Sequence, residues 1–208
     1  MYLPPAFRED DRKILHEIMR GARLSNLVTA TAQGLISTPL PLFLDETEGK
    51  QGVLYGHVAR GNPQWQAQPL GEALAIFMGP DAYVTPSWYA SKAEHGKVVP
   101  TWNYSAVHAF GPIEFFDDAQ RLLAVVTRLT ELHEKPRDEP WAVGDAPESY
   151  IKSQLRGIVG LRLPITRLEG KRKLSQNRNA ADRAGVVKGL AQSDRPMDRL
   201  VASQIPTD

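Results

Sequence analysis

The stretch VPTWNYSAVHAFG, from Val99 to Gly111, concentrates aromatic and hydrogen-bonding side chains on one short segment. Its apolar residues and flanking turn formers predict a long β-strand over 99–110. Side chains alternate across a strand, so this segment has two faces of different chemistry. One face carries Trp102, Tyr104, Ala106 and His108, and the other carries Asn103, Ser105 and Val107.

Two interpretations of this strand stay open. In the first, it is an ordinary barrel strand with an aromatic inner face and a polar outer face. In the second, it is the wall of a binding site for a flat heteroaromatic ligand. Trp102 would then offer a face for stacking, and Asn103 would offer a donor and an acceptor side by side.

Outward from this strand, the chain reads as many short strands with few helices between them. Strands are predicted over 24–31, 35–44, 53–57, 73–79, 82–85, 112–116 and 158–168. Helices are predicted over 8–20, after an N-cap at Asp117, over 149–155, and from an N-cap at Asn179 to Leu190, with a single turn starting at Asn62. This pattern favours a mainly β (α+β) fold built on an antiparallel barrel with flanking helices.

Composition limits the class of protein. The 208 residues are 42% hydrophobic and carry a net charge of +1, which suits a globular chain with no global attraction to nucleic acid. The chain has no cysteine, which excludes a disulfide framework and a thiolate metal site. No apolar run is long enough to cross a bilayer, so we expect a cytoplasmic protein. We expect one domain over residues 1–190 and a polar, mobile tail over 191–208.

Three further segments could bind a ligand. In AYVTPSWYASK, aromatic residues surround Pro86, and hydroxyls at Thr85 and Ser87 could serve a phosphate or cap the backbone. In LYGHVARGNPQW, Arg60 precedes a predicted N-cap at Asn62, which could form an anion site or an ordinary corner. In EGKRKLSQNRNAADR, the cations could form a solvated strand end or a phosphate or nucleic-acid contact.

Other chemistry finds no support in the sequence. The histidines include no His-x-x-x-His pair, so we predict no metal site. There is no Gly-x-Ser-x-Gly elbow, and no residue is assigned a catalytic role.

Five blocks, taken in order, carry a resemblance to a known family. They are MYLPPAF, GHVARGNPQW, GPDAYVTPSWY, VPTWNYSAVHAFG and KLSQNR. Together they resemble the PaiB-type family of FMN-binding negative transcriptional regulators, over roughly 1–190. The resemblance implies a split β-barrel related to flavin reductases and pyridoxamine-phosphate oxidases. It also implies a homodimer with FMN at the dimer interface.

The resemblance implies a set of cofactor-binding residues by their position in the motifs. One group stands where related barrels place their phosphate-binding strand end, and the others come from the aromatic segments and the basic segment. The set is His57, Val58, Ala59, Arg60, Asn62, Ser87, Trp88, Trp102, Asn103, Tyr104, Lys173, Ser175, Gln176 and Asn177.

One position departs from the family pattern. Pro39 stands in ISTPLPLF where the family often has His, which removes an imidazole and a backbone donor.

Binding of DNA is implied by the resemblance alone, since no helix-turn-helix is evident. Two other functions stay open: a flavin-dependent oxidoreductase using NAD(P)H, and a haem-binding split barrel with His57, His95 or His108 as the axial ligand.

Overall fold

The computed structural model describes residues 1–207 and divides into two compact units. The first unit contains Met1–Gly21, Met78–Val107 and the chain from Glu169 onward. The second unit contains Ala22–Phe77 and His108–Leu168. Three long strands, β6 (Ala73–Val84), β7 (Thr101–Gly111) and β10 (Arg167–Lys173), each have residues in both units. The prediction of a single domain over residues 1–190 stays a prediction.

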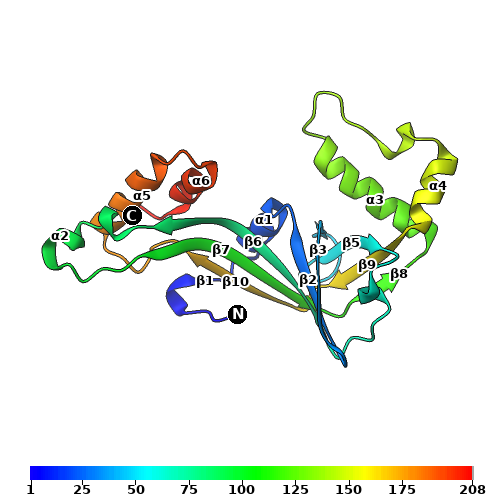
Figure 1. Ribbon diagram of the computed structural model, residues 1–208, viewed down its shortest axis with the longest axis horizontal. Helices are drawn as coiled ribbons and strands as arrows, with labels where there is room; N and C mark the ends of the chain where they lie inside the picture. The colour runs from blue at the N-terminus through cyan, green and yellow to red at the C-terminus, as the bar shows by residue number, and fades with distance from the viewer. Residues whose placement is uncertain (208) are drawn as a thin grey trace. The chain divides into compact units, whose positions relative to one another are not determined.

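The strands form two sheets (Figure 1). One has the order β1-β10-β7-β6-β2-β3, with β1 at Arg8–Glu9, β2 at Ser25–Thr31 and β3 at Gly34–Leu40. The other has the order β4-β5-β9-β8, with β4 at Phe43–Asp45, β5 at Val53–Ala59, β8 at Glu114–Phe116 and β9 at Ile158–Pro164. The β2–β3 hairpin turns between Thr31 and Gly34, as predicted, and Gly34 takes a positive φ of 118° there.

The helices follow the predicted caps closely. The α-helices are α1 (Arg12–Gly21), α2 (Ser91–His95), α3 (Ala119–Glu134), α4 (Glu148–Arg156), α5 (Ala180–Ala191) and α6 (Pro196–Gln204). Short 3₁₀ turns lie at η1 (Pro5–Phe7), η2 (Pro63–Trp65), η3 (Pro86–Trp88) and η4 (Val143–Asp145). Asn62 caps η2 and Asn179 caps α5, both as predicted, whereas the cap of α3 is Asp118 rather than Asp117.

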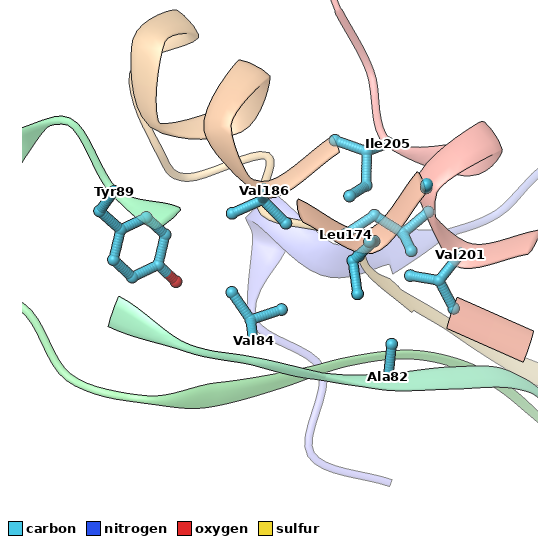
Figure 2. Close-up of a cluster of buried hydrophobic side chains, with 9 residues drawn as sticks. Ala82, Val84, Tyr89, Leu174, Val186, Val201 and Ile205 are labelled. Carbon is cyan, nitrogen blue, oxygen red and sulfur yellow. The ribbon is translucent and has the colours of Figure 1, made fainter. Parts of the chain in front are cut away.

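In the first unit, α5 and α6 pack together against β6 (Figure 1). Figure 2 shows side chains of β6 facing residues of both helices. Their cluster is fully apolar apart from the Tyr89 hydroxyl, and consists of Ala82, Val84, Tyr89, Leu174, Val186, Leu190, Val201, Ala202 and Ile205. Trp88 packs against the same cluster.

In the second unit, α3 and α4 cover the smaller sheet. Leu122, Val125 and Leu129 of α3 recur at helical spacing and are buried against Phe116 and Leu155. These residues form the face of α3 that packs in the core of the unit. Within residues 1–207, no helix is both long and apolar enough to cross a membrane.

Several sequence-based expectations about the elements are wrong, and the strand predicted over 35–44 is one of them, because β3 ends at Leu40 and β4 begins at Phe43. The predicted break between 79 and 82 does not exist, because β6 runs on through Gly79 and Pro80. The predicted strand over 158–168 is two strands, with β9 ending at Pro164 and β10 extending to Lys173. The tail predicted over 191–208 contains the helix α6, whose Val201 and Ile205, four residues apart, are buried in one cluster with Leu190, and its mobility stays a prediction.

The interpretation of β7 as a strand with an aromatic inner face and a polar outer face is also wrong. Asn103 and Ser105 are buried, whereas Trp102 is 52% exposed. Asn103 can be buried because its amide has a hydrogen-bond partner inside the first unit. The aromatic side chain at the start of this strand is left toward solvent.

Candidate functional site

Two aromatic side chains of the first unit, Tyr83 of β6 and Trp102 of β7, are exposed. Tyr83 of β6 is 46% exposed, and its ring meets that of Trp102 edge to face at 5.8 Å between centroids. Tyr104, two residues further along the same face of β7, is half-buried. Exposed aromatic pairs are costly to hydrate and are enriched at binding surfaces.

Two lysines of β10 contact this part of the unit: the buried Lys171 lies beside the Tyr104 ring, and Lys173 lies at the backbone of Trp102. The Lys171 ammonium is 5.4 Å from the Tyr104 ring centroid and 5.5 Å from that of Tyr2, and it donates to the Tyr2 carbonyl at 3.1 Å. The Lys173 ammonium donates to the Trp102 carbonyl at 2.6 Å and to the Thr101 hydroxyl. Lys173 therefore ties the end of β10 to the start of β7, next to Trp102.

The electrostatics around Lys173 favour an anion. Burial, followed by the positive charges of Lys171 and Arg178, lowers the pKa of the Lys173 ammonium. An ammonium has three donors, and two of them are satisfied by Thr101 and Trp102. The third donor, with the positive charges of Lys171 and Arg178 nearby, could bind a phosphate.

The loop after Lys173 is held from inside. Asn103 donates to the Ser175 hydroxyl at 3.0 Å, and that hydroxyl lies 3.2 Å from the Asn103 amide oxygen, so the pair is reciprocal. Gln176 accepts from the Leu174 N–H at 2.7 Å and donates to the Arg172 carbonyl at 2.6 Å. The side chains of Asn103, Ser175 and Gln176 thus form hydrogen bonds within the protein. Asn177 is exposed.

Trp88 and Ser87 have structural surroundings. Trp88 lies against the glycines of α5, where an added Cβ at Gly189 would be 2.2 Å from its ring. Ser87 is exposed and accepts from the Lys92 ammonium at 3.3 Å. Trp88 is partly buried against the apolar cluster of the first unit, as expected of a structural aromatic residue in such a loop.

The predicted phosphate-binding corner lies in the second unit, and its polar groups contact the chain itself. Arg60 donates to the carbonyls of Arg156 at 2.7 Å and Ile158 at 3.2 Å, and it lies 3.6 Å from the Asp117 carboxylate. Asn62 caps η2 and donates to the Thr38 hydroxyl at 2.9 Å. The structure thus gives Arg60 and Asn62 a role in holding this corner.

The other residues of this segment contribute little polar capacity. Val58 is a core residue, and Ala59 is exposed. His57 has a buried Nδ1 with no hydrogen-bond partner among the described residues, and burial lowers the pKa of its imidazole. Pro39 stands on β3, at the end of its sheet, where a residue without an N–H is tolerated.

Of the predicted residues, Trp102, Asn103, Tyr104, Lys173, Ser175 and Gln176 come together in the first unit. His57, Val58, Ala59, Arg60 and Asn62 come together in the second. Sequence reasoning left Lys171 and Tyr83 out of the set. Lys171 shares a face with Lys173 on a strand, a signal that was missed because the segment was interpreted only as a basic run.

The fold defines the class of protein. The flavocytochrome Anf3 from Azotobacter vinelandii matches with a TM-score of 0.56 at 13% identity, over 80% of this chain and 69% of that one. The FAD and haem binding protein from Mycobacterium smegmatis matches with a TM-score of 0.53 at 16% identity, over 80% and 73%. The likeness concerns the fold alone, and it confirms the predicted split β-barrel class.

The family follows from the sequence. Residues 1–167 match the family described as "Putative FMN-binding domain", and the chain belongs to this family. The protein named "Protease synthase and sporulation protein PAI 2" from Bacillus subtilis is 32% identical over 203 residues, covering 97% of this chain and 95% of that protein. The predicted family and its cofactor, FMN, are thereby confirmed.

Proposed function

We propose that the first unit holds FMN against the exposed face of β7, with Trp102 and Tyr83 beside the flavin ring and Lys173 and Lys171 beside the phosphate. The observation that carries this proposal is the exposed Tyr83–Trp102 pair, together with the Lys173 ammonium at the Trp102 carbonyl and the Lys171 ammonium over the neighbouring Tyr104 ring. A planar heteroaromatic ring with an anionic tail is complementary to both halves of this arrangement.

The residues present fit FMN by their chemistry. Lys173 keeps one donor for an anion, and burial, followed by the positive charges of Lys171 and Arg178, lowers its pKa. When bound, FMN supplies the capacity to accept and release electrons at its ring system. The chain's own part is to pack against that ring and to hold the phosphate.

We propose further that the protein acts in the cytoplasm as a homodimer and as a negative transcriptional regulator of the PaiB type. The Bacillus subtilis relative is named for protease synthesis and sporulation, and the regulatory role is what the family resemblance implies. The exposed apolar side chains of Met78, Tyr83, Val99 and Trp102 support burial against a second copy. A direct contact with DNA rests on the family resemblance.

A flavin-dependent oxidoreductase is the second candidate. Trp102 is half exposed, so a flavin stacked on it would stay open to a second reactant such as NAD(P)H. Turnover of NAD(P)H by the FMN-loaded protein separates the two candidates, since a regulator needs flavin binding without multiple turnovers.

The test of the proposal is a titration of the cofactor-stripped protein with FMN and, in parallel, with riboflavin, which lacks the phosphate. We expect saturable binding of FMN at about one per chain and weaker binding of riboflavin, because one charge-assisted contact is worth about 1.5–3 kcal/mol. Equal affinity for the two flavins would remove the lysines from the phosphate site. Light scattering of the same samples measures the oligomeric state.

A further inference from the structure

The buried Asn103–Ser175 pair lies directly behind the proposed site. Asn103 is 0% exposed and Ser175 is 4% exposed, and their side chains bond to each other. Asn103 precedes Tyr104 and follows Trp102, so its side chain leaves β7 on the opposite face from these rings. Neither Asn103 nor Ser175 can therefore contact a ligand that lies on the exposed face.

The backbone at Ser175 takes an uncommon conformation. Its φ of 63° is the only positive φ at a residue other than glycine in the described part of the chain. Such backbones persist where the surroundings hold them, and they concentrate at functional sites. Here the holding contacts are the Asn103 amide and the two hydrogen bonds of Gln176.

This conformation sets the course of the chain just after Lys173. Lys173 is the last residue of β10, and Ser175 follows two residues later. The Lys173 ammonium reaches the Trp102 carbonyl, and Asn103 is the next residue of β7. Two links, from Lys173 to the Trp102 carbonyl and from Ser175 to Asn103, thus join the start of β7 to the end of β10 and the loop that follows it.

We propose that Asn103 and Ser175 are positioning residues, which hold the Lys173 ammonium beside Trp102 so that one ligand can contact both. This role rests on the proposed FMN site. Without the pair, the end of β10 would be free to move relative to β7, and the phosphate and the ring would no longer be held at one spacing.

The test is a double-mutant cycle between Ser175 and Lys173, measured as the dissociation constants of FMN and riboflavin. Ser175→Gly removes the hydroxyl and still permits a positive φ, so the variant is expected to fold. Lys173→Ala removes the cation. Ser105→Ala is the matched control, because Ser105 lies on the same buried face of β7 and its hydroxyl has no hydrogen-bond partner within residues 1–207.

We expect Ser175→Gly to weaken FMN binding by about tenfold, with a smaller effect on riboflavin. In the Lys173→Ala background, Ser175→Gly should weaken FMN by less than about threefold, because the contact that it positions is already gone. Ser105→Ala should bind FMN like the wild type. Asn103→Ala should reproduce the selective loss of FMN affinity.

Equal losses from Ser175→Gly in both backgrounds, or equal losses for FMN and riboflavin, would overturn the proposal in favour of a purely structural pair. Thermal unfolding of each variant shows whether the fold is kept, and an unfolded Ser175→Gly variant would overturn the proposal in the same way. Failure of the wild-type protein to bind FMN would instead contradict the proposed function itself.

Discussion

At the scale of the residue, the candidate site separates side chains that face a ligand from those that support them. Trp102 and Lys173 reach the exposed face, whereas Asn103, Ser175 and Gln176 bond within the protein. The sequence showed which residue types gather here. A period of two cannot show which face of a strand is buried, and this is why one of the two interpretations of β7 placed its aromatic face on the inside.

Trp102→Ala tests the aromatic half of the site. Because the side chain is 52% exposed, we expect its removal to leave thermal stability almost unchanged and to weaken binding of FMN and riboflavin alike. Aromatic contacts of this kind are worth about 0.5–1.5 kcal/mol beyond burial, or up to roughly tenfold in affinity. Unchanged titration curves for both flavins would show that the ring does not contact the cofactor.

Arg60→Ala tests the second unit's corner. Arg60 donates to the carbonyls of Arg156 and Ile158, so we expect its loss to lower the free energy of unfolding by about 1–3 kcal/mol. Chemical denaturation measures this loss, and FMN titration measures the predicted phosphate contact separately. A folded variant of wild-type stability with weakened FMN binding would assign Arg60 to the phosphate instead.

His57 gives the second unit a pH-dependent stability. Burial lowers the pKa of its imidazole from the ordinary 6.5, so the unfolded chain binds the proton more readily than the folded chain. Stability should therefore fall as the pH drops below about 6.5, and His57→Gln should reduce this slope. The measurement is Tm between about pH 7.5 and pH 5.

The exposed His133 of α3 supplies the control for this experiment, since His133→Gln leaves His57 in place. A slope that persists in the His57→Gln protein at its full wild-type size would show that other groups cause it.

At the scale of the element, the features predicted best from the sequence were those that depend on a few neighbouring residues, such as helix caps. The caps at Asn62 and Asn179 were found because a side chain and a backbone N–H two or three residues away decide them. The continuity of β6 was missed because Gly79 and Pro80 are turn formers in isolation. Gly79 instead lies where space is tight, since an added Cβ would lie 3.1 Å from that of Ser105.

The packing of α5 on Trp88 was also invisible in the sequence. Gly185→Ala should be favourable by about 1 kcal/mol on helix propensity alone. However, the added Cβ would lie 1.9 Å from the Trp88 carbonyl oxygen, which is backbone and cannot rotate away. We expect a net loss of stability of about 1–3 kcal/mol, measured by thermal or chemical unfolding.

Gly21→Ala is the matched control for Gly185→Ala, since Gly21 also belongs to a helix and an added Cβ there meets no atom of the described chain within 4 Å. A stabilised Gly185→Ala protein would contradict the close contact between α5 and Trp88.

At the scale of the whole molecule, the match to the FMN-binding family covers residues 1–167, and the proposed site adds Lys171, Lys173 and Ser175 beyond that match. The family and the fold class were predictable because the motif blocks extend along most of the chain. The location of the cofactor was not predictable from the sequence, because the predicted residues fall into two groups, one in each unit. Among the described residues, the group in the first unit presents an exposed aromatic pair beside a cluster of cations, and the group in the second unit does not.

The central claim is that FMN lies against Trp102. The most direct measurement is an FMN titration followed by tryptophan emission, in the wild-type protein and in the Trp102→Phe variant. The difference between the two signals reports Trp102 alone. We predict that this difference signal is quenched and saturates at the same FMN concentration as the quenching of the flavin's own fluorescence. Binding of FMN that leaves the Trp102 emission unchanged would contradict the account and move the cofactor away from this face of β7.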